Sequence, residues 1–99
     1  MSTDARRALK AIRDAVAAGR YRVLRHFASR MAERGLVLPD VLAVLDSPDS
    51  IHDDGMDRFG RPKWILSGRV DTDALVEFVC AMDTDEKGNQ VVLITIYWT

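Results

Sequence analysis

The chain has 99 residues, of which 47% are hydrophobic and 29% are charged. This length and composition are typical of one small soluble globular domain, so we expect a single domain over residues 1–99 and exclude a two-domain protein. No stretch approaches the roughly 18 consecutive apolar residues of a membrane-spanning helix, and the N-terminal residues lack the apolar segment of a secretory signal. The sequence therefore predicts a cytoplasmic protein with no membrane partner.

Charge is divided unevenly along the chain, although the formal net charge is only −1. Residues 1–39 carry nine basic and three acidic side chains, a net charge of +6, whereas residues 40–99 carry five basic and twelve acidic side chains, a net charge of −7. Attraction to phosphate acts over a Debye length of about 8 Å, so a basic N-terminal surface can bind nucleic acid on a nearly neutral protein. The alternative is a solvated, arginine-rich helix face.

Helical patterns occupy the first half of the chain. Residues 3–18 have an amphipathic helical pattern, with an apolar stripe of Ala5, Ala8, Leu9, Ile12 and Val16. A second helix is predicted over residues 25–34 and ends at Gly35, because glycine readily adopts the conformation that terminates a helix. A third short helix is expected between Pro39 and Ser47.

The second half of the chain has the pattern of β-strands. Residues 63–70, 74–82 and 91–98 are rich in β-branched and aromatic side chains, and a weaker strand is expected near Ile51. Short turn-rich segments separate the strands, including residues 71–73. We therefore predict an α+β fold in which N-terminal helices pack on a twisted antiparallel sheet of three to four strands.

Successive side chains of a strand point to opposite faces of the sheet. The residue pattern of the last strand therefore predicts which face packs against the helices and which face is partly open. One set, expected to pack under the helices, is Val92, Ile94, Ile96 and Trp98. The other set, expected to be partly open, is Val91, Leu93, Thr95 and Tyr97. Tyr97 would then meet a ligand, and the alternative is an aromatic at the edge of the core.

The segment RHFASRMAERG places His26, Arg30 and Arg34 at four-residue spacing. On a helix this spacing drifts by about 40° at each step and forms a slanted ridge. Histidine moves protons near neutral pH, and arginine stabilises the charge that builds on phosphate. Metal-independent RNA cleavage uses side chains of these types. The alternative is a capping or packing histidine on a solvated helix.

The segment RFGRPKW interleaves basic and aromatic side chains, namely Arg58, Phe59, Arg61, Lys63 and Trp64. Arginines beside aromatic rings suit phosphate contact combined with base stacking. We therefore predict a second RNA-binding group here, and the alternative is a turn whose tryptophan joins the core.

No metal site or cofactor is predicted. The acidic segment DSPDSIHDDGMD, residues 46–57, is rich in oxygen ligands but lacks the ligand order of a calcium loop or a second histidine. The single Cys80 lies in an apolar run and has no second cysteine to pair with, so it is expected to be a reduced core thiol. An acidic loop that keeps the basic site from self-associating, or that contacts a basic partner, fits residues 46–57 better.

A family resemblance comes from the segments HFASRMAERGL, PDVLAVL, LSGRV and VVLITIYW. Together they resemble a family of small uncharacterised bacterial proteins that looks like a branch of the RelE/MqsR-type toxin superfamily, over about residues 20–99. The resemblance implies a RelE-like fold and a metal-independent messenger-RNA endonuclease, the toxin of a type II toxin–antitoxin pair. It also implies a cognate antitoxin and RNA as partners, with the ribosome as a further partner of ribosome-dependent members.

On this resemblance His26 is the general base or acid, Arg30 with Lys63 or Arg61 contacts the phosphate in the transition state, and Tyr97 lies on the last strand. The predicted catalytic residues are therefore His26, Arg30, Lys63 and Tyr97. The RNA-binding residues, predicted from the basic and aromatic patterns, are Arg34, Arg58, Arg61 and Trp64. Two other classes stay open on the sequence alone. One is a non-catalytic protein-binding module, or an inactive toxin relative in a regulatory complex. The other is a DNA-binding regulator, which the acidic and apolar third helix disfavours because a recognition helix needs polar residues that read bases.

Overall fold

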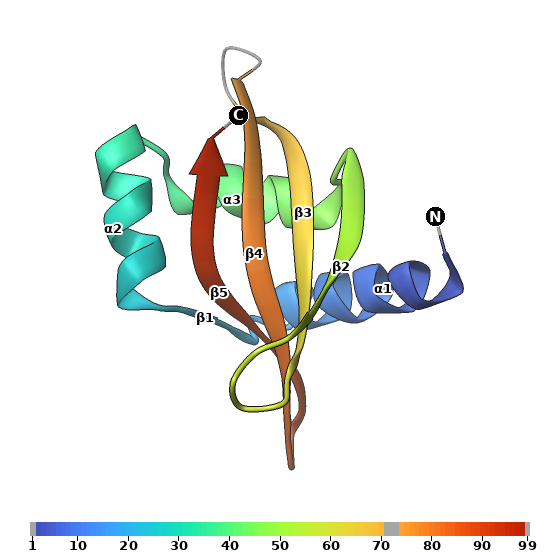
Figure 1. The fold of residues 1–99 in the computed structure, drawn as a ribbon. Coiled ribbons are helices and arrows are strands. Elements are labelled where there is room, and N and C mark those ends of the chain that lie inside the picture. The colour runs from blue at the N-terminus through green and yellow to red at the C-terminus, as the bar shows by residue number, and fades with distance from the viewer. Residues whose placement is uncertain (1, 71–73, 99) are drawn as a thin grey trace.

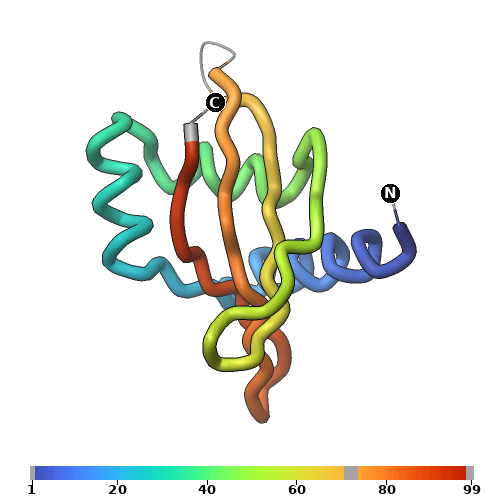
Figure 2. Tube along the Cα trace, viewed as in Figure 1, coloured from blue at the N-terminus to red at the C-terminus, as the bar shows by residue number. Residues whose placement is uncertain are grey.

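A computed structural model describes residues 2–70 and 74–98 of the chain, and Figures 1 and 2 show its path. The helices and strands in chain order are α1 (Thr3–Ala17), β1 (Tyr21–Val23), α2 (Arg25–Arg34), α3 (Leu38–Asp46), β2 (Ser50–Met56), β3 (Pro62–Val70), β4 (Ala74–Asp85) and β5 (Gly88–Trp98). The three predicted helices and the α+β class are confirmed. The turn predicted at residues 71–73 lies outside the described residues.

The helix ends follow from local chemistry. The Ser2 hydroxyl accepts a hydrogen bond from the Ala5 amide at 3.1 Å and so satisfies one free donor at the start of α1. Gly35 ends α2 in the left-handed conformation, with φ +67°, as predicted. The Leu36 amide then donates to the Met31 carbonyl, which closes the end of the helix.

The sheet has five strands in the order β1-β5-β4-β3-β2. The number predicted, three to four, is therefore wrong, and the sheet is mixed rather than antiparallel because β1 pairs with β5 in parallel, with Tyr21 beside Val91. The other neighbours are antiparallel. A three-residue strand is too short to show a period-two pattern, and its partner lies at the other end of the chain. The sequence therefore predicts residues 20–24 only as an extended segment or a short link, without a partner strand.

One face of the sheet forms the core. Helices α1 and α3 lie behind the sheet in Figure 1 and cover side chains that are fully buried, including Leu66, Phe78 and Leu93. Helix α2 stands beside β5, where Phe27 packs against Phe78 with ring centroids 5.8 Å apart. The opposite face of the sheet is free of helices in this view. The fold thus leaves one covered face and one open face.

A β-bulge decides which side chains of β5 point to the open face. Val79 of β4 pairs with Thr95 but the next residue, Cys80, pairs with Leu93, so Ile94 is an extra residue. An extra residue reverses the alternation, and both Leu93 and Ile96 therefore belong to the core cluster.

The predicted orientation of β5 side chains is confirmed after the bulge, for Ile96, Thr95 and Tyr97, and is wrong before the bulge. Thr95 is nevertheless buried, at 9% exposure, and not partly open as predicted. There Val91 and Leu93 face the helices, and Val92 lies on the other side. The predicted orientation of the Trp98 side chain lies outside what the structure describes.

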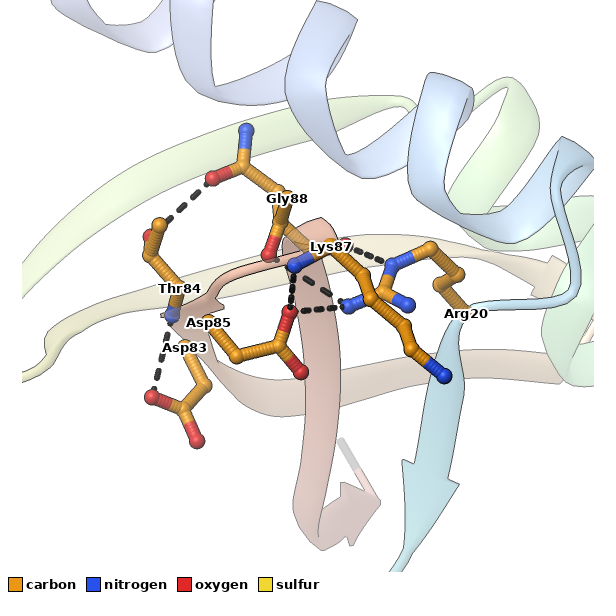
Figure 3. A network of polar contacts seen from close by, with 7 residues as sticks. Arg20, Asp83, Thr84, Asp85, Lys87 and Gly88 are labelled. Atoms are coloured by element: carbon orange, nitrogen blue, oxygen red, sulfur yellow. Dashed lines mark hydrogen bonds and ion pairs between the residues drawn. The ribbon is translucent and has the colours of Figure 1, made fainter.

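The β4–β5 hairpin projects past the helices, at the bottom of Figures 1 and 2. Arg20, in the connection from α1 to β1, holds its base: the guanidinium donates to an Asp85 carboxylate oxygen at 2.6 Å and to the Asn89 carbonyl at 3.0 Å (Figure 3). Hydrogen bonding by the Lys87 amide and the charge of Arg20 hold the pKa of Asp85 below its ordinary value, against the effect of burial. The hairpin is therefore fixed to the rest of the fold.

Candidate functional site

The face of the sheet opposite α1 and α3, which we call the open face, carries a row of polar side chains. The antiparallel registers place Ser50 beside Ser67, Ser67 beside Glu77, and Glu77 beside Tyr97. Directly paired residues on one face have Cβ atoms about 4.5–5.5 Å apart, so the row is continuous across four strands. A polar row on a sheet face without helices is a surface that a ligand can reach.

His26 reaches the open face from the start of α2. Its Nε2 atom lies 2.9 Å from the hydroxyl oxygen of Thr95 on β5, a hydrogen-bonding distance. The His26 side chain is exposed, whereas Thr95 is only 9% exposed. The buried threonine thus fixes the position of an imidazole whose other edge is open to solvent.

Arg30 lies one helical turn further along α2 and contacts the same strand. Its Nε and Nη2 atoms donate to the Ile96 carbonyl at 3.3 Å each, and its Nη1 atom is 3.5 Å from a Glu33 carboxylate oxygen. Tyr97, the next residue of β5, is 52% exposed on the open face. Three of the four predicted catalytic residues, His26, Arg30 and Tyr97, therefore meet along residues 95–97.

The fourth predicted catalytic residue, Lys63, lies elsewhere. It belongs to β3, two strands away from β5, and its Nζ atom is 3.3 Å from a carboxylate oxygen of Asp54. Arg34 is at the far end of α2, about 12 Å along the helix axis from His26 at 1.5 Å per residue. Neither side chain belongs to the group on β5.

Trp64 requires a correction. It points to the covered face, belongs to the core cluster and is only 8% exposed. The predicted base stacking on this ring does not fit that placement, because a residue next to Lys63 on the same strand must point to the opposite face. The apolar pattern around Trp64 was equally compatible with the core, which is where the tertiary packing puts the ring.

Glu77 is a candidate site residue that the sequence reading missed. It is half-buried on the open face, directly beside Tyr97 on the neighbouring strand. A carboxylate beside a tyrosine is a candidate for proton transfer. The available signal was a single acidic residue inside the apolar run ALVEFVCAM. An isolated charge in such a run marks a face that is not part of the core.

A second basic group lies at the opposite end of the open face. The loop between β2 and β3, residues 57–61, curls in front of the sheet in Figure 1. It lines a cavity of about 570 Å³ together with β1 and β4, and the lining residues are Arg22, Leu24, Arg58, Phe59, Arg61 and Asp83. The predicted residues Arg58 and Arg61 therefore come together, and Arg22 joins them because β1 pairs with β5.

The acidic segment, residues 46–57, mainly neutralises basic side chains of this chain. Carboxylate oxygens of Asp49, Asp54 and Asp57 lie 4.0, 3.3 and 2.6 Å from nitrogens of Arg69, Lys63 and Arg61. Asp57 also accepts hydrogen bonds from the Phe59 and Arg61 amides. Burial tends to raise the pKa of Asp57, but these donors and the Arg61 charge outweigh it and lower that pKa.

Comparison with protein families identifies the chain. Residues 23–98 match the family described as Domain of unknown function (DUF4258). This match covers most of the chain, so the protein belongs to that family, with α1 outside the matched segment. A search of curated proteins found no match. Within the described residues, no helix is long and apolar enough to cross a membrane.

Proposed function

We propose that this protein is a metal-independent RNA endonuclease, an mRNA interferase with a RelE-like fold, and the toxin of a type II toxin–antitoxin pair. One observation carries the proposal. The imidazole of His26 contacts Thr95, the guanidinium of Arg30 contacts the Ile96 carbonyl, and Tyr97 is the next residue, so three candidate groups lie along three consecutive residues of one strand. The family match itself names no activity, and the reaction proposed is the one that the expected resemblance to RelE/MqsR-type toxins implies.

The proposed reaction transfers two protons. A base removes the proton of a ribose 2′-hydroxyl, the oxygen bonds to the adjacent phosphorus, and the bond from phosphorus to the 5′-oxygen breaks. An acid then protonates the leaving 5′-oxygen, which yields a cyclic phosphate and a 5′-hydroxyl. We assign these two roles to His26, which contacts β5 at Thr95, and to Glu77, which lies beside Tyr97 on the neighbouring strand β4.

Arg30 and Tyr97 have supporting roles in this proposal. Arg30 stabilises the negative charge that builds on the phosphate, since a guanidinium donates to two phosphate oxygens at once. Tyr97 positions the phosphate or the leaving oxygen through its exposed hydroxyl. An antitoxin that covers the open face would block all these groups together. If the protein acts like the ribosome-dependent toxins, ribosome binding would bring the messenger RNA to the open face.

Expression in growing bacterial cells tests the proposal. The wild-type protein is expected to arrest growth and to deplete RNA, and purified protein is expected to cut RNA in the presence of EDTA. The His26→Ala and Arg30→Ala variants are expected to lose both effects. His52→Ala is the matched control, because His52 is an exposed histidine on the open face at the other edge of the sheet. Wild-type protein without effect on growth or RNA would sink the proposal.

An inactive relative that only binds protein is the second candidate. His26 contacts Thr95 and Arg30 contacts the Ile96 carbonyl, and both contacts attach α2 to β5. These contacts give both side chains a structural role, which favours the second candidate. Thermal unfolding separates the two candidates. If His26→Ala lowers the melting temperature strongly but wild-type protein cuts no RNA, the structural role is sufficient.

A further inference from the structure

The cavity beneath the β2–β3 loop has an excess of positive charge. Three of its lining residues are arginines, Arg22, Arg58 and Arg61, and its one acidic side chain is Asp83. The Arg61 guanidinium is occupied, because it lies 2.6 Å from Asp57 and 3.7 Å from Asp83. In the described part of the chain, no carboxylate lies within ion-pair distance of Arg22 or Arg58. Among the described residues, two guanidinium groups without an ion-pair partner therefore line one cavity.

The loop is held in a defined conformation without any ligand. Asp57 accepts the Phe59 and Arg61 amides at 2.9 Å each, and the Asp57 amide donates to the Arg61 carbonyl at 2.9 Å. The Arg58 and Arg61 guanidinium carbons lie 4.9 and 5.0 Å from the centroid of the Phe59 ring, at cation–π distance. Because Phe59 and Asp57 orient both arginines, binding an anion costs little further ordering of the loop.

The cavity shares the open face with His26. Arg22 pairs with Val92, three residues before Thr95 on β5. At about 3.3 Å per residue the two points lie roughly 10 Å apart along the strand. A strand of nucleic acid that reaches His26 can therefore continue over the cavity.

We propose that this cavity binds a backbone phosphate of single-stranded nucleic acid, with Arg22 and Arg58 as the two contacts and Phe59 as the positioning residue. The site is separate from the proton-transferring group on β5. This inference rests on the proposed function in one respect, which is that the bound nucleic acid is RNA. Its test measures binding without cleavage.

The probe is a fluorescein-labelled, ten-nucleotide RNA with 2′-O-methyl groups, which cannot attack its own phosphates. Arg22→Ala and Arg58→Ala are each expected to weaken binding roughly tenfold at low salt, the loss of one charged hydrogen bond. Each variant is also expected to reduce the slope of log K against log salt by about 0.7. Arg6→Ala is the matched control, since Arg6 is an exposed arginine of α1, behind the sheet.

A variant of opposite sign excludes loss of fold as the cause. Asp83→Asn removes the acidic group of the cavity and is expected to tighten binding several-fold, which a misfolded protein would not do. Phe59→Leu is expected to weaken binding less than Arg58→Ala, because the charges remain but are less well oriented. The same oligonucleotide with deoxyribose tests whether the 2′ position matters, and inorganic phosphate as competitor tests whether a free anion suffices.

The inference is overturned if the RNA does not bind, or if Arg22→Ala and Arg58→Ala behave like Arg6→Ala. Binding that has no salt dependence overturns it as well, because contacts between arginine and phosphate must weaken as the salt concentration rises. Inactive wild-type protein that still binds the oligonucleotide through Arg22 and Arg58 would refute the proposed cleavage and leave this inference intact.

Discussion

The two faces of the sheet differ most clearly on β4. Phe78 points to the covered face and is fully buried, whereas the preceding residue, Glu77, is half-buried on the open face beside Tyr97. Neighbouring residues of one strand therefore differ in role: Phe78 belongs to the core, and Glu77 is a polar group of the candidate site. Changes on the covered face should act on stability, and changes on the open face should act on binding and cleavage.

The largest expected effect is on the covered face. Phe78→Ala removes a fully buried ring that packs against Phe27, and we expect a loss of about 3–5 kcal/mol in the free energy of unfolding. Urea denaturation measures it. Glu77→Gln, on the open face of the same strand, is expected to change stability by about 0.5 kcal/mol or less. Equal losses for the two variants would contradict the division between the faces.

The second prediction concerns the packing of α3 on the covered face. A Cβ atom at Gly68 would lie 2.8 Å from a methyl carbon of Val44, so Gly68→Ala is expected to cost about 1–3 kcal/mol. Val44→Ala makes room, and the double variant should lose less than the sum of the two single losses. Additive losses in a double-mutant cycle would show that this close approach does not limit the packing.

The third prediction concerns the contact that holds His26 on the open face. Thr95→Val keeps the shape of the side chain and removes its hydroxyl, so we expect a loss of about 1 kcal/mol in stability. Thr95→Ser keeps the hydroxyl and should keep the His26 contact. An NMR spectrum of the His26 ring, compared between these two variants, reports the contact directly. Identical ring signals would contradict the assigned partner.

The fourth prediction is a loss of stability in acid. The pKa of Asp57 is lower in the folded protein than its ordinary value of 3.8. The folded state therefore gains stability from the carboxylate above that value and loses it as the pH falls through the lower, folded pKa. Asp57→Asn should reduce the decrease in the free energy of unfolding as the pH falls, and it should destabilise the β2–β3 loop. Denaturant titrations at several pH values between 2 and 5 measure the difference, and parallel curves for the two proteins would contradict it.

The smallest effect is expected for chemical modification of Cys80, a buried residue of the covered face. Burial raises the pKa of this thiol to about 12, so almost no thiolate is present at pH 8. A thiol reagent should leave the folded protein unmodified and should react once urea unfolds it. Rapid modification under native conditions would mean that the covered face opens often.

Local signals in the sequence determined most of the secondary structure. Helical spacing defined the three helices, and Gly35 ended α2 as expected because it has φ +67°. Alternating β-branched residues located β3, β4 and β5. They also indicated the orientation of Thr95 and Tyr97, although Thr95 is buried. The four-residue spacing singled out His26, Arg30 and Arg34, of which His26 and Arg30 contact β5. All of these depend on residues close together in the chain.

The tertiary structure alone decided how these elements combine. The bulge at Ile94 reversed the alternation along β5, the parallel pairing of β1 brought Arg22 to the cavity, and the covered face took Trp64 into the core. Glu77 entered the candidate site only because β4 and β5 are in this register. Register and pairing between distant segments depend on the total burial of apolar surface, which no local pattern contains.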